Sequence, residues 1–181
     1  MQLADSATFL LRQLAIHDTA TIARLADYPD VADAMMSLSH PVSAAAVRQY
    51  LQDAAQLEVD GLARFFAVES AGQLVGGVSL LCIDRQHSRA ELWVWIGKPF
   101  WGRGLATRAG FGVLKYAFDD LGLNRVEALH LARNVGMAQV LTKLGFTREG
   151  LLREHFQREG SFEDVVLYGL LASAHAGSAN G

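Results

Sequence analysis

The sequence reads Trp101-Gly102-Arg103-Gly104-Leu105-Ala106-Thr107 at the point where an apolar run, Leu92 to Ile96, is followed by a helical apolar pattern that extends to Leu121. These spacings predict a strand, a short loop and a helix, in that order. Glycines let backbone N–H groups converge on a ligand, and the helix adds free N–H groups and the positive end of its dipole. The junction therefore suits a pyrophosphate, although it is equally consistent with a tight structural turn.

Two well-known nucleotide-binding loops fit this stretch poorly. A Walker-type loop needs a wider glycine spacing and a Lys before Ser or Thr, whereas Gly102 and Gly104 are close together and no Lys precedes Thr107. A dinucleotide fingerprint needs three glycines, and only these two are present, followed by Ala106. The type of pyrophosphate therefore has to be inferred from the surrounding sequence.

Composition predicts a folded, soluble domain. The chain has 181 residues, 51% of them hydrophobic and 19% charged, which favours one domain over 1–171 followed by a disordered tail, 172–181. A net charge of −3 argues against nonspecific nucleic-acid binding. Residues 1–6 lack the pattern of a secretion signal, and no apolar run is long enough to span a membrane. We therefore expect a cytoplasmic protein, with its single cysteine, Cys82, buried in an apolar run.

The remaining patterns predict an alternating order of helices and strands. Asp18 and Ser43 are residue types that cap helix N-termini, and Pro29 is expected to end the first helix. The order predicts an α/β fold, a mixed sandwich around one central sheet. The predicted strands are 9–14, 65–69, 74–83, 90–96, 125–131, 146–157 and 162–171, and the predicted helices are 18–28, 41–57, 105–121 and one that begins at 134.

Several landmarks follow the loop in a fixed order. They are Asn134, Lys143-Leu144-Gly145-Phe146, Glu149-Gly150-Leu151-Leu152-Arg153 and Gly160-Ser161-Phe162-Glu163-Asp164. With Ala90-Glu91-Leu92 before the loop, this pattern resembles the GNAT superfamily of acyl-CoA-dependent N-acetyltransferases. The family loop, Arg/Gln-x-x-Gly-x-Gly/Ala, is matched by Gly104 and Ala106, with Trp101 at its first position. The tryptophan form looks like the Rim-type branch, which acetylates N-termini of ribosomal proteins.

The resemblance implies a mostly antiparallel sheet of about seven strands, with a splayed strand pair that forms the CoA cleft. Acetyl-CoA is then the cosubstrate, and no metal is implied. Backbone groups of Val94, Trp95 and Ile96 would pair with the pantetheine arm, and Asn134 would lie near it. Lys143 is a candidate for the 3′-phosphate, with a surface lysine as the alternative. The pyrophosphate would be held by Gly102, Arg103, Gly104, Leu105, Ala106 and Thr107.

The implied reaction transfers an acetyl group to a primary amine, a protein N-terminal α-amine in the leading hypothesis. Glu91 is the first candidate for the catalytic base, with Glu149, His155 and His87 as alternatives. A small-molecule amine, such as an aminoglycoside, a polyamine or an amino acid derivative, is the second hypothesis, and a noncatalytic acyl-CoA sensor is the third. We expect no direct binding to nucleic acid or membrane, and the resemblance suggests a homodimer.

Two departures from the resembled family affect the leaving thiolate. Rim-type enzymes commonly carry a Ser at the position of Met137, and many GNAT enzymes carry a Tyr at the position of Leu141. Neither replacement can donate a proton. We therefore expect the thiolate to leave unprotonated or to take its proton from water.

Overall fold

The computed structural model describes residues 3–4, 9–35, 38–158 and 160–178. One sheet orders its strands β1-β2-β3-β4-β5-β6-β8-β7, and every neighbouring pair is antiparallel except β5 with β6. The predicted mixed, mostly antiparallel sheet is confirmed, and the two-residue β1 adds an edge to the seven predicted strands. The strands are β1 Leu3–Ala4, β2 Phe9–Gln13, β3 Arg64–Ser70, β4 Gln73–Asp84, β5 Arg89–Ile96, β6 Arg125–Leu131, β7 Thr147–Arg158 and β8 Ser161–Leu171.

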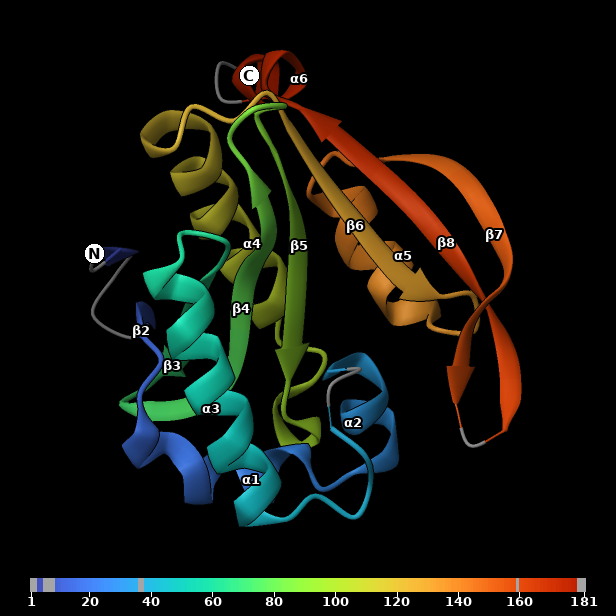
Figure 1. The fold of residues 1–181 in the computed structure, drawn as a ribbon. Coiled ribbons are helices and arrows are strands. Elements are labelled where there is room, and N and C mark those ends of the chain that lie inside the picture. Colours follow the sequence, from blue (N-terminus) through green and yellow to red (C-terminus); the bar gives the residue numbers. More distant parts are fainter. Residues whose placement is uncertain (1–2, 5–8, 36–37, 159, 179–181) are drawn as a thin grey trace.

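Helices cover both faces of the sheet (Figure 1). Side chains of α1, α2 and α3 pack around Trp95 of β5, whereas α4 and α5 pack on the opposite face against Leu92 and Val94. Alternate residues of β5 therefore enter two different cores, as the two-residue period of a strand requires. The helical segments are η1 Ile16–Asp18, α1 Thr19–Ala26, α2 Pro29–Met35, α3 Ala44–Val59, η2 Lys98–Phe100, α4 Leu105–Lys115, η3 Tyr116–Asp120, α5 Val135–Lys143 and α6 Ala172–Ser178.

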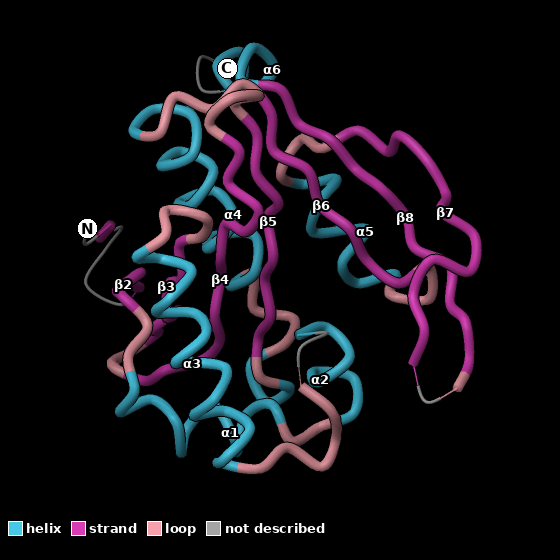
Figure 2. The backbone as a smooth tube through the Cα atoms, in the orientation of Figure 1, coloured by secondary structure: helices cyan, strands magenta, loops and turns pink. Residues whose placement is uncertain are grey.

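The parallel pair β5 and β6 separates partway along its length. The two strands pair at Arg89 with Arg125, at Ala90 with Val126 and at Glu91 with Glu127, and the pairing ends there. β6 nevertheless stays paired with β8 as far as Leu131, and β5 stays paired with β4 as far as Ile96. Figure 2 shows the two strands diverging beyond the paired end. The expected splayed pair is therefore present, with its apex at Glu91.

Two local predictions are corrected by the structure. Pro29 does not merely follow the first helix, because α1 ends at Ala26 and Pro29 begins α2. Proline is well suited to a first helical position, where its missing N–H would have had no partner. Cys82 is exposed rather than buried. The register of β4 shifts between Leu81 and Asp84, and Cys82 has a φ of 50°, so this bulge breaks the inward–outward alternation.

The expected disordered tail is in part helical. Residues 172–178 form α6, which follows β8 directly, while 179–181 lie outside the described residues. Residues 1–6 were expected to lack a secretion signal, and of these, residues 1–2 and 5–6 also lie outside the described part of the chain. Within that part, no helix is both long enough and apolar enough to span a membrane.

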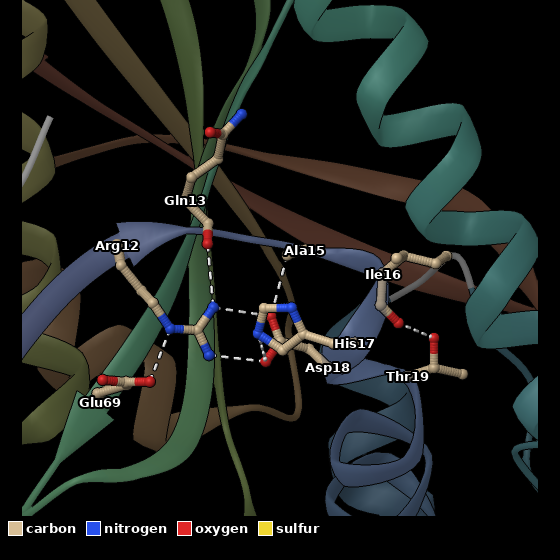
Figure 3. A network of polar contacts seen from close by, with 8 residues as sticks. All are labelled: Arg12, Gln13, Ala15, Ile16, His17, Asp18, Thr19 and Glu69. Carbon is tan, nitrogen blue, oxygen red and sulfur yellow. Dashed lines mark hydrogen bonds and ion pairs between the residues drawn. The ribbon is translucent and has the colours of Figure 1, made fainter.

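An ion pair with a buried carboxylate fixes the position of β2 relative to the start of α1 (Figure 3). Arg12 on β2 donates to both carboxylate oxygens of Asp18, at 2.8 and 2.7 Å, and to Glu69 on β3 at 2.6 Å. Asp18 also accepts the backbone N–H of Ala15. Its side chain is only 4% exposed, so burial alone would raise its pKa, but the Arg12 and Ala15 donors hold the pKa below its usual value. These contacts join the β2 edge to the base of α1.

Replacing Arg12 with Met should lower the free energy of unfolding by about 3 kcal/mol, because the buried Asp18 carboxylate loses its cation. Since the pKa of Asp18 is depressed in the folded state, the ion-pair contribution is present above the unfolded pKa and is lost as the pH falls through the folded value. The stability gap between wild type and variant should therefore close in acid. Urea unfolding at several pH values, with exposed Arg48→Met as control, measures the gap. A constant gap would contradict this account.

Candidate active site

A cleft of about 650 Å³ runs from the diverging strands to the N-terminus of α4. Its volume is within the range of ligand-binding pockets. It brings together every position that the resemblance assigned to CoA, from β5, the loop and the start of α5. The walls include Val94, Trp95, Ile96, Gly102, Arg103, Gly104, Leu105, Ala106, Thr107, Asn134 and Lys143.

The loop at the wide end of the cleft has the features of an anion site. Gly102 and Gly104 have φ values of 76° and 72°, in the left-handed region that favours glycine. Gly104 is the N-cap residue of α4, and no side chain caps this helix end. The first N–H groups of α4 are therefore open to the cleft, at the positive end of the helix dipole. A Cβ atom at Gly104 would meet nothing within 4 Å, so the space above the backbone is open.

Contacts within the loop hold it against the end of β5. The Trp101 indole donates to the backbone carbonyl of Ile96 at 2.6 Å. Lys98 pairs with Asp30 of α2 at 2.7 Å and lies 5.8 Å from the centre of the Trp101 ring. Arg103 donates to the carbonyl of Pro99 at 3.2 Å and stacks on Phe100, so its guanidinium is partly committed to the loop itself. The tryptophan therefore orders the loop rather than only filling space.

The start of α5 closes the cleft on the other side. Asn134 is the N-cap of this helix, and its side-chain oxygen accepts the N–H of Met137 at 3.0 Å. Asn134 therefore caps α5 in the way that is typical of its residue type. Because the oxygen is used by the cap, the amide NH2 group is what Asn134 can offer to a ligand.

Glu91 lies at the apex of the strand pair rather than in the wall of the cleft. Its carboxylate is half-buried and accepts the indole N–H of Trp93 at 3.2 Å. Its charge helps to raise the pKa of the Cys82 thiol, after the larger effect of partial desolvation of the sulfur. Its neighbour across the pair, Glu127, is instead engaged by Arg125 at 2.8 Å. Glu91 is thus a carboxylate held by a neutral donor at the narrow end of the cleft.

The three alternative bases lie elsewhere. Glu149 on β7 is bound by both terminal nitrogens of Arg125, which lowers the pKa of its carboxyl group and so makes it a weaker base. His87 is exposed in the turn between β4 and β5, and His155 is exposed on β7. None of the three lines the cleft or the small cavity between β5 and β6.

A bridge of charged side chains crosses the cleft, and sequence reasoning did not reveal it. Asp33 of α2 accepts from Arg133, which precedes α5, at 2.6 Å, and its other oxygen is 3.0 Å from Arg158 of β7. Arg133 also donates to Glu163 of β8 at 2.6 Å, which lowers the pKa of that carboxyl group. Each of these ion pairs joins residues far apart in the sequence. No local pattern could have paired them.

A buried histidine was also missed. His130 on β6 is 6% exposed and lines a small cavity between the splayed strands, together with Met137 and Leu141 of α5. Burial lowers the pKa of its imidazole, and the charge of Arg148 acts in the same direction, against a raising hydrogen bond to Leu131. His130 follows Val126 and Ala128 at the strand period, so the sequence places it on a core-facing stripe. The period gives no sign that this position is polar.

This arrangement of splayed strands and glycine loop agrees with a family comparison. The model of the acetyltransferase (GNAT) domain matches residues 8–147, more than half of the chain. The chain belongs to the GNAT family. This protein is accordingly an acetyl-CoA-dependent N-acetyltransferase, as the sequence resemblance implied. In its described residues, no group of three or more His, Cys, Asp or Glu is arranged to hold a metal ion.

Individual GNAT relatives differ in their acceptors. An uncharacterized N-acetyltransferase, p20 of Bacillus licheniformis, is 29% identical over 92% of this chain and 94% of its own length. The spermidine N(1)-acetyltransferase of Escherichia coli K12 is 34% identical over 57% of this chain and 55% of that enzyme. A solved structure of RimL, a ribosomal L7/L12 α-N-protein acetyltransferase in complex with coenzyme A, has a TM-score of 0.85 at 20% identity, covering 96% and 99% of the two chains. The last likeness concerns the fold alone.

Replacing Trp101 with Phe should lower the free energy of unfolding by about 1 kcal/mol, because the Ile96 carbonyl loses its indole donor. Urea unfolding should show a lower midpoint with an unchanged slope. Phe111→Leu, on the outer face of α4, is a control because that side chain is 45% exposed, close to the 48% of Trp101. Equal stability of Trp101→Phe and wild type would mean that the hydrogen bond does not hold the loop.

Proposed function

We propose that this protein acetylates protein N-terminal α-amines, as the Rim-type branch does. The observation that carries the proposal is the end of β5–β6 pairing at Glu91, which opens a cleft leading to the uncapped start of α4. The pantetheine arm of acetyl-CoA lies along the free edge of β5 in this proposal, where an extended chain can add to a strand. The thioester is then near the apex, and the pyrophosphate is at the glycine loop.

The residues at the wide end suit the phosphates of acetyl-CoA. We assign the pyrophosphate to the backbone N–H groups of residues 102–107, where the helix dipole favours negative charge. Arg103 and Lys143 both line the cleft and add positive charge. Asn134 offers its NH2 group to a carbonyl of the arm. Backbone groups of Val94, Trp95 and Ile96 pair with the arm.

The charge balance around the cleft supports a peptide acceptor over a polyamine. Asp30 is paired with Lys98, and Asp33 with Arg133 and Arg158. These carboxylates are therefore neutralised, whereas attraction of a polycation calls for an excess of negative charge. A cleft of balanced charge accepts a chain with one ammonium group at its end. Spermidine remains the second candidate because of the relative that acetylates it.

Glu91 is our candidate for the catalytic carboxylate. The acceptor arrives as an ammonium ion and must lose one proton before its nitrogen can attack the thioester carbonyl carbon. Glu91 orients the ammonium group and passes this proton to water. A backbone N–H of the 94–96 segment donates to the carbonyl oxygen as negative charge develops on it. The attacking nitrogen then loses its extra proton, and collapse of the intermediate breaks the C–S bond to give the amide and the CoA thiolate, which takes up a proton to become CoA.

Saturating acetyl-CoA should raise the Tm by roughly 5–11 °C, because ligand at 100 times Kd adds about 2.7 kcal/mol to the stability of a domain of this size. Gly104→Asp should abolish the shift, since Asp tolerates a left-handed backbone but repels a pyrophosphate. Gly72→Asp is a matched control, with a φ of 73° in the β3–β4 turn and open space around its Cβ. A full shift in Gly104→Asp would exclude this loop as the phosphate site.

The acceptor can be tested with two amines of different charge. A lysine-free hexapeptide with a free α-amine should be acetylated with a higher kcat/KM than spermidine, because the acidic side chains of the cleft are neutralised. The same peptide with a blocked N-terminus is the control, and it should give no product. Mass spectrometry identifies the acetylated nitrogen. Preference for spermidine would overturn the assignment to the Rim-type branch and favour the small-amine alternative.

Glu91→Gln should lower kcat by about 10²-fold with little change in the KM for acetyl-CoA, because the carboxylate acts on the amine and not on the cofactor. Glu127→Gln, the neighbouring position on β6, is the control. Its carboxylate is already engaged by Arg125, so its kcat should stay near that of the wild type. An unchanged kcat in Glu91→Gln would remove Glu91 from the mechanism.

A further inference from the structure

His130 has one ring nitrogen without a partner in the described structure. Nδ1 lies 2.8 Å from the carbonyl oxygen of Leu131, which can only accept, so Nδ1 carries the hydrogen. Nε2 is then an acceptor with a free lone pair, and it is buried with no hydrogen-bond partner. Buried polar atoms are nearly always satisfied in native proteins, and an exception calls for an explanation. An apolar side chain at this position would avoid the penalty, so stability alone does not explain a histidine here.

Among the residues that line the small cavity between β5 and β6, His130 is the one best suited to accept and donate a proton. The α5 side chains that line this cavity, Met137 and Leu141, have no proton to give. Asp33 lines it from α2, but its carboxylate is paired with Arg133 and Arg158. Imidazole is the group that both accepts and donates a proton near neutral pH.

The groups that face His130 keep its lone pair available. Tyr168 of β8 stacks beside the ring at 5.4 Å between centroids, and Arg148 of β7 adds a positive charge nearby. Burial and Arg148 lower the pKa of His130, so the ring is neutral at physiological pH. Asp33 is the acidic group of the same cavity, and its charge is balanced by arginines.

We propose that Nε2 of His130 carries a proton from the reacting amine nitrogen to the sulfur of CoA. After the neutral amine attacks, its nitrogen bears one proton too many, and the C–N bond is complete. Nε2 accepts that proton as the C–S bond breaks, and the imidazolium then returns it to the thiolate. Overall, one ammonium ion and one acetyl-CoA give the amide, the CoA thiol and one proton. That proton is the one released through Glu91 before the attack. The proposal rests on the placement of the thioester near the strand apex.

The two proton transfers take place on opposite faces of the sheet. Glu91 shares its side of β5 with Trp93 and Trp95, and Trp95 packs among α1, α2 and α3. His130 shares its side of β6 with Val126 and Ala128, which pack in the core that includes α4 and α5. The small cavity between the strands is lined by Trp93, which is on the Glu91 side of β5, as well as by His130, so we place the reacting carbon beside this cavity. This separation gives each residue one proton to handle.

His130→Leu and His130→Gln test the relay. With the acceptor that the wild type turns over, both should lower kcat by roughly 10²-fold or more while the KM for acetyl-CoA stays within about threefold. His130→Leu should also have an equal or higher Tm, since it removes a buried unsatisfied atom. Tyr168→Phe, which keeps the stacked ring, is the control and should retain kcat. Wild-type kcat in either His130 variant, or a loss of kcat that follows a loss of Tm, would overturn the relay.

Binding of CoA gives a second readout that needs no acceptor. The thiol of CoA should donate to Nε2, so the wild type should bind CoA roughly two- to fivefold more tightly than desulfo-CoA. That ratio should shrink toward one in His130→Leu, and an equal ratio in both proteins would overturn the relay. If acetyl-CoA fails to shift the wild-type Tm, or still shifts Gly104→Asp, the proposed placement fails and the relay with it. If those results are as expected and only the His130 variants behave as wild type, the relay alone is wrong.

Discussion

The separation of β5 from β6 after Glu91 is the constraint on which the other features of the site depend. Strands in a sheet normally satisfy each other's backbone groups, and an open edge inside a protein is unfavourable unless something pairs with it. Here each strand keeps one partner, since β5 remains with β4 and β6 with β8. The outer pairings hold the two arms in place, so the gap is fixed by the sheet itself. A rigid open edge of this kind is suited to an extended ligand.

Charge is distributed unevenly along the gap, and this follows from which elements surround it. The wide end has an uncapped helix start with Arg103 and Lys143 nearby, and is therefore positive. The middle is crossed by the Asp33–Arg133 bridge, whose charges cancel. Glu91 lies at the apex on one face of the sheet, whereas the neutral His130 lies further along β6 on the other face, in the small cavity that Asp33 also lines. The proposed cosubstrate, an anion with an uncharged reactive end, matches this order of charge.

Local pattern predicted the elements well because their signals are short-range. The strand, glycine loop and helix around residues 92–121 follow from periodicity and backbone preference, and Asn134 caps its helix as its residue type predicts. Errors arose where a neighbour in space mattered. A bulge turned Cys82 outward, and Pro29 began a helix where we had expected only the end of one. The bulge depends on the pairing of β4 with β5, which a local window does not contain, whereas proline is compatible with both the end and the start of a helix.

The sequence by itself determined the order of the main strands and of α1, α3, α4 and α5, the loop that suits a pyrophosphate and the resemblance to an acetyltransferase family, because these depend on residues close together in the chain. Only the tertiary structure decided that pairing stops at Glu91, that Asp33 meets Arg133 and Arg158, and that His130 is buried with a free ring nitrogen. Each of these three features depends on segments that are far apart in the sequence and meet only in the folded protein. Their energies come from desolvation and from partners brought together by folding, and no spacing along the chain records which partner arrives.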